Sequence, residues 1–156
     1  MKHIACLVGI AGVTFIFFLI AFYVEKNIAL YNMVVPHAGV QLDQWLNSFW
    51  HWAIVGIIIS GVASLLWYIL GQWVFKINRW EKSGKRGIWL CFILLPVIAI
   101  ILEWVFTKKA QAGAWPAYLF YVLNGLLCYY LATALCSPSS FKYTPLLASR
   151  VWRRAW

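Results

Sequence analysis

Carboxylates are the side chains of this sequence most able to do chemistry, and few are present. The chain has four of them: Glu25, Asp43, Glu81 and Glu103. Only Glu103 falls inside a long apolar run, about one helical turn from its end. An ionisable side chain within a membrane span is costly to bury, so Glu103 is a candidate functional residue. Its carboxylate could instead reach the membrane interface and pair with a lysine there. The lysines at that end are Lys26, Lys108 and Lys109.

Thiols and imidazoles form no recognisable reactive arrangement in the sequence. Cys128 and Cys136 are separated by about 12 Å of helical rise, beyond disulfide reach. Cys6 and Cys91 fall near predicted cytoplasmic ends, where thiols stay reduced. The three histidines lack carboxylates at metal-ligand spacing, and no phosphate-binding loop or nucleophile motif is present. We therefore predict a protein that is not an enzyme, with no catalytic residue, cofactor or metal.

The elements that position these groups are long apolar segments. The chain of 156 residues is 64% hydrophobic and 11% charged, whereas a soluble domain has about 25% charged residues. The apolar runs are continuous, which excludes the alternating pattern of a β-barrel. The sequence predicts an all-α integral membrane protein with a four-helix transmembrane domain at 1–136 and a basic cytoplasmic tail at 137–156. The predicted spans are about 4–24, 49–75, 88–106 and 115–136.

Two faces of small or weakly polar residues recur at i+4 spacing on the second and fourth predicted spans. Small side chains let helix backbones approach closely, within one chain or between copies. The amide of Asn124 needs a hydrogen-bond partner in such a setting. We expect these faces to form helix-packing or homo-oligomer interfaces, with Glu103 and Asn124 as possible functional polar groups. The faces comprise Gly56, Ser60 and Ser64, and Asn124, Cys128 and Ala132.

Two further segments have the pattern of amphipathic helices. Leu42, Trp45, Leu46 and Phe49 recur at i, i+3, i+4 and i+7 after a break at Pro36. That segment is predicted to lie at the outer interface or to lead into the second span. Residues 146–156 place arginines on one side and apolar residues on the other, which predicts a helix on the cytoplasmic leaflet.

The distribution of cations predicts the orientation of the spans. Of 13 lysines and arginines, three lie on one predicted side and ten on the other. Since cationic loops stay in the cytoplasm, both termini are predicted to be cytoplasmic, and compactness favours a bacterial inner membrane. The predicted cytoplasmic cations are Lys2, Lys76, Arg79, Lys82, Lys85, Arg86, Lys142, Arg150, Arg153 and Arg154.

The net charge of +9 has a membrane explanation. The basic loop and tail would contact anionic headgroups or a cytoplasmic or membrane protein partner, and no nucleic-acid motif accompanies the charge. We expect a non-enzymatic membrane subunit that oligomerises or scaffolds an assembly of the secretion, conjugation or phage-defence type. Two alternatives stay open: a small oligomeric channel or transporter, and an immunity protein against a membrane-active toxin.

Overall fold

Four helical rods make up the described part of the computed structural model, which covers residues 2–27, 41–74, 82–108 and 115–136. Two of the rods contain a short π-helical segment, labelled η. The elements are α1 (Lys2–Tyr23), α2 (Leu42–Ile69) with η2 (Leu70–Val74), α3 (Lys82–Lys108), and α4 (Trp115–Val122) with η3 (Leu123–Leu127) and α5 (Cys128–Leu135). All regular elements in these ranges are helical, which confirms the predicted all-α class at that level.

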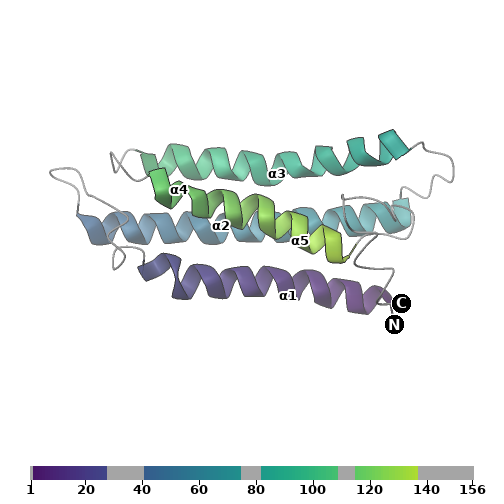
Figure 1. The fold of residues 1–156 in the computed structure, drawn as a ribbon, viewed down its shortest axis with the longest axis horizontal. Helices are drawn as coiled ribbons and strands as arrows, with labels where there is room; N and C mark the ends of the chain where they lie inside the picture. The colour runs from purple at the N-terminus through teal and green to yellow at the C-terminus, as the bar shows by residue number, and fades with distance from the viewer. Residues whose placement is uncertain (1, 28–40, 75–81, 109–114, 137–156) are drawn as a thin grey trace.

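The rods lie side by side along the long axis of the molecule (Figure 1). Helix α2 contacts α1, α3 and the rod formed by α4, η3 and α5, and that rod likewise contacts α1 and α3. Within the described ranges, four stretches are long and apolar enough to cross a membrane, as the sequence predicted: His3–Asn27, Leu42–Val74, Gly87–Thr107 and Ala117–Leu135.

The amphipathic segment before the second predicted span is the start of α2 itself. Residues from Leu42 onward continue without interruption into the long helix, so the segment leads into the second predicted span, which is one of the two placements that the sequence allowed. Trp45 and Phe49 are buried, and their rings stack at 5.1 Å. The Trp45 indole donates a hydrogen bond to the backbone carbonyl of Thr107 on α3 at 3.3 Å. The apolar stripe therefore reflects packing between helices.

Close approach between rods depends on small residues. A Cβ added at Gly61 of α2 would lie 2.8 Å from the Thr14 hydroxyl of α1. A Cβ added at Gly9 of α1 would lie 2.9 Å from the Cys136 sulfur. Because an added Cβ at either position would have to displace a side chain of the neighbouring helix, the two glycines let α1 rest directly on both neighbours.

Candidate functional site

The first member of the candidate site is Glu25, in the short turn that follows α1. Its side chain is fully buried, although the sequence placed it just outside the first span. The amide nitrogen of Asn124 donates to both carboxyl oxygens, at 2.8 Å to Oε1 and 2.9 Å to Oε2. Asn124 lies on η3, so this contact joins residues 99 positions apart. The amide thus has the partner that the sequence required but did not identify.

The second member is Glu103 on α3, and it is also buried, with 1% of its surface exposed. Neither carboxyl oxygen has a hydrogen-bond partner among the described residues. The carboxyl group packs against Gly56 of α2, where an added Cβ would lie 2.9 Å from its Cδ. A bulkier residue at position 56 would therefore displace the Glu103 side chain.

Of the three lysines that the alternative interpretation offered as partners for Glu103, the structure describes the side chain of Lys26 alone. The ammonium of Lys26 lies over the Phe22 ring at 4.9 Å and over the Trp50 ring at 5.3 Å. That geometry is typical of cation–π contacts, in which the ring faces attract the cation. Lys26 is exposed, whereas the Glu103 carboxyl faces the interior. The side chain of Lys108 and the whole of Lys109 lie outside what the structure describes.

A tyrosine hydroxyl from α4 completes the surroundings of the two glutamates. Tyr121 is fully buried, and its ring stacks on Phe49 at 4.6 Å. Its hydroxyl donates to the Phe49 carbonyl at 3.3 Å and lies within electrostatic range of both glutamates. We call Glu25, Glu103, Tyr121 and Asn124 together the carboxyl cluster.

Local chain geometry explains why the carboxyl cluster can form. Asn124 and its neighbour Gly125 lie in the π-helical η3, an irregularity that is often found at functional sites. A Cβ added at Gly125 would lie 2.7 Å from Ile100 of α3. On α2, the Ser60 hydroxyl donates to the Gly56 carbonyl at 2.8 Å and is satisfied within its own helix. The small faces of α2 and η3 therefore let α3 lie close enough to carry Glu103 inside.

The predicted packing faces both lie inside the bundle. All six of their residues are buried within this one chain: Gly56, Ser60, Ser64, Asn124, Cys128 and Ala132. A contact between copies would therefore have to use other surfaces. All four cysteines are free: Cys6, Cys91, Cys128 and Cys136.

The structure does not describe the side chains of the residues predicted to contact a cytoplasmic partner or lipid. Lys76 and Arg79, together with the C-terminal Arg150, Arg153 and Arg154, fall in ranges that the structure does not describe, as does the predicted tail helix at 146–156. The remaining three belong to the first turns of α3, but their side chains are not described: Lys82, Lys85 and Arg86.

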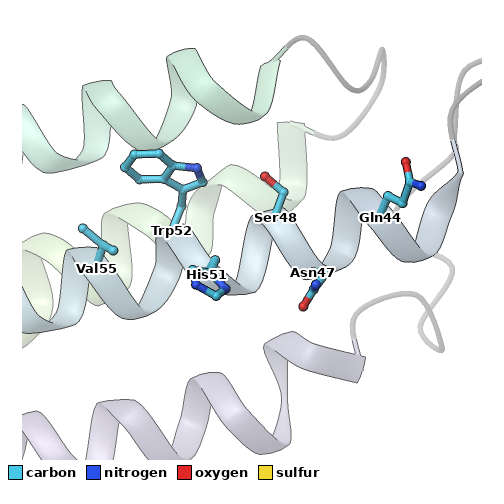
Figure 2. A pocket seen from close by; sticks show the side chains of 6 residues that line it. All are labelled: Gln44, Asn47, Ser48, His51, Trp52 and Val55. Atoms are coloured by element: carbon cyan, nitrogen blue, oxygen red, sulfur yellow. The ribbon is translucent and has the colours of Figure 1, made fainter.

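An open groove on the flank of α2 is a separate feature. It has a volume of about 470 Å³ and lies near the end of α2 that carries Trp45. Figure 2 shows its lining side chains projecting from successive turns of α2. The lining residues are Gln44, Asn47, Ser48, His51, Trp52 and Val55. The groove offers neutral hydrogen-bonding groups and an imidazole but no carboxylate, so its chemistry is distinct from that of the carboxyl cluster.

What the carboxyl cluster can do is bind positive charge. Two carboxyl groups, an amide and a phenol hydroxyl are enclosed together, and only one carboxyl group has a donor. Within the described part of the chain, no group of three or more His, Cys, Asp or Glu residues could hold a metal ion. No protein-family model, curated protein or solved structure matches this chain.

Proposed function

We propose that this protein is a non-enzymatic subunit of a membrane assembly, crossing the bilayer four times with both termini in the cytoplasm. One observation carries the membrane part of the proposal: ionisable and amide groups are buried in the bundle while many large apolar side chains are exposed. Glu25, Glu103 and Asn124 are at most 1% exposed, whereas Leu94 and Ile98 on α3 are 54% and 52% exposed. A bundle sorted in this way is adapted to lipid as its solvent.

The basic segments support a partner on the cytoplasmic side. Lys82, Lys85 and Arg86 begin α3, and the sequence directly before them carries further cations. Such clusters attract anionic headgroups at about 1 kcal/mol per cation, and they offer the same complementarity to an acidic protein surface. The scaffolding role rests on this concentration of charge.

The test is the mass of the protein extracted gently from its native membrane, with every co-purifying chain identified. A stoichiometric foreign subunit is the expected result. A bare monomer, or a homo-oligomer without other chains, would overturn the subunit proposal.

A charge-reversal variant makes this test specific. Replacing Lys82, Lys85 and Arg86 with Glu should release the partner, while the matched control K82R/K85R should retain it. Retention of the partner by the Glu variant, with unchanged membrane topology, would show that these cations do not hold it.

A second candidate function, a small transporter, is favoured by one specific observation. Glu103 is buried in the bundle without a hydrogen-bond partner among the described residues, and buried carboxylates often mark ion pathways in membrane proteins. Flux through proteoliposomes that is lost in Glu103→Gln would support this function. Absence of flux under every imposed ion or proton gradient would exclude it.

A further inference from the structure

The carboxyl cluster has more potential negative charge than its surroundings can stabilise. Removing a carboxylate from water costs several kcal/mol unless it is paired or fully hydrogen-bonded. The amide of Asn124 offsets part of that cost for Glu25. Glu103 has no such donor, and its carboxyl group also lies in the electrostatic field of Glu25. Two like charges at such a site repel each other, so binding one positive charge would stabilise the pair.

No described side chain supplies that charge. The element α2 faces Glu103 with Gly56, and α4 contributes the uncharged phenol of Tyr121. From η3 comes the neutral amide of Asn124, and from the turn after α1 comes Glu25 itself. The ammonium of Lys26 lies over two aromatic rings. The imidazole of His51 belongs to the exposed groove on α2.

The space beside Glu103 decides between a proton and a larger cation. The carboxyl group lies so close to α2 that a methyl group at Gly56 would overlap it. A metal ion with even part of its hydration shell needs several oxygen ligands at 2 Å or more, as in magnesium and calcium sites. Among the described residues, no third His, Cys, Asp or Glu joins the two glutamates to hold a metal ion. A proton needs one carboxyl oxygen and no additional volume.

We propose that Glu25 and Glu103 form a proton-binding site that holds one exchangeable proton within the bundle, with Asn124 fixing the orientation of Glu25. Protonation forms one O–H bond on a carboxyl group. Deprotonation breaks that bond and transfers the proton to water, leaving a carboxylate. Glu25 lies next to the exposed residues Lys26 and Asn27, so the site exchanges protons with the aqueous phase at that end of the bundle. This site goes beyond the subunit role, because a scaffold and a transporter could both carry it.

The experiment is infrared difference spectroscopy of the full chain in lipid vesicles between acid and alkaline pH. The wild-type protein should show the C=O stretch of a protonated carboxyl group, shifted in D₂O and lost at high pH. Glu103→Gln should remove that band, since the amide imitates a protonated acid but cannot ionise. Asp43→Asn is the matched control, because Asp43 is exposed at the start of α2, and it should retain the band.

A titration of the protons released as the pH is raised tests the same site without assigning an infrared band to a particular residue. Wild-type vesicles should release a proton that Glu103→Gln vesicles do not, while Glu25→Gln should change the pH at which release occurs. An identical spectrum and titration for wild type and Glu103→Gln would overturn the proposal. A carboxyl band that responds to sodium at constant pH would also overturn it, because the site would then bind a metal cation.

Discussion

The hydrogen bonds between Asn124 and Glu25 offer the sharpest quantitative prediction. Replacing Asn124 with Leu removes the amide nitrogen that donates to both carboxyl oxygens, at 2.8 and 2.9 Å, and leaves the buried carboxyl group without a donor. A hydrogen bond to a charged group contributes about 1.5–3 kcal/mol, and an unsatisfied buried acceptor costs a similar amount. We expect Asn124→Leu to lower the free energy of unfolding by about 2–3 kcal/mol. For a chain of this size that corresponds to a fall in Tm of roughly 4–12 °C.

A double-mutant cycle separates this interaction from other effects of the substitution. In Glu25→Leu the partner is absent, so adding Asn124→Leu should cost much less than it does alone. The coupling free energy should be about 1.5–3 kcal/mol, measured by thermal or denaturant unfolding in lipid–detergent micelles. Asn47→Leu, at an exposed position on α2, is the control and should change stability by about 0.5 kcal/mol or less. Additive costs within about 0.5 kcal/mol would refute the interaction.

Two matched pairs of variants test the packing of the bundle with the same unfolding measurement. Gly61→Ala should cost about 1–3 kcal/mol, because its Cβ would lie 2.8 Å from the Thr14 hydroxyl. Gly12→Ala, which meets nothing within 4 Å, should instead stabilise α1 by about 0.5–1 kcal/mol. Ile57→Ala should cost about 2 kcal/mol or more, since Ile57 is 1% exposed and its removal leaves a cavity. Ile58→Ala, at a position that is 54% exposed, should cost about 0.5 kcal/mol or less. Equal costs within either pair would contradict the described helix packing.

The four long helices were predictable because hydropathy is a local property of the sequence. Each apolar run is long enough to span a bilayer by itself, and the structure places a helix on each. Glu103 was identifiable for the same reason, since a carboxylate within such a run is conspicuous. The small-residue faces of the second and fourth spans could be recognised from their i+4 spacing. The sequence did not show which helices would pack against them.

Glu25 was missed because its burial depends on a residue far away in the chain. It follows the first apolar run and precedes Lys26 and Asn27, so the local sequence resembles the start of a loop. Its burial requires the η3 segment to present Asn124 at the same depth. One signal was available: the buried amide of Asn124 needed a partner, and the chain has only four carboxylates. Which of the four carboxylates accepts from Asn124 depends on tertiary packing, and the spacing of residues along the sequence does not reveal it.

The start of α2 illustrates the same limit. An apolar stripe at helical spacing fits a membrane surface and a neighbouring helix equally well. Trp45 and Phe49 pack inward because each has a partner inside the bundle. The Thr107 carbonyl accepts a hydrogen bond from the Trp45 indole, and the Tyr121 ring stacks on Phe49. Those partners lie 62 and 72 positions away, beyond any local pattern.

The most direct test of the four-span bundle is cysteine accessibility on the two sides of the membrane. Single cysteines at Asp43, at the start of α2, and Ser83, at the start of α3, would be probed in intact cells with a membrane-impermeant thiol reagent. The unmodified protein gives the background from its four native cysteines. The expected result is that Asp43→Cys is labelled from outside and Ser83→Cys only after the membrane is opened. Labelling of both from the same side would contradict the membrane-spanning arrangement, and the reverse order would contradict the proposed orientation.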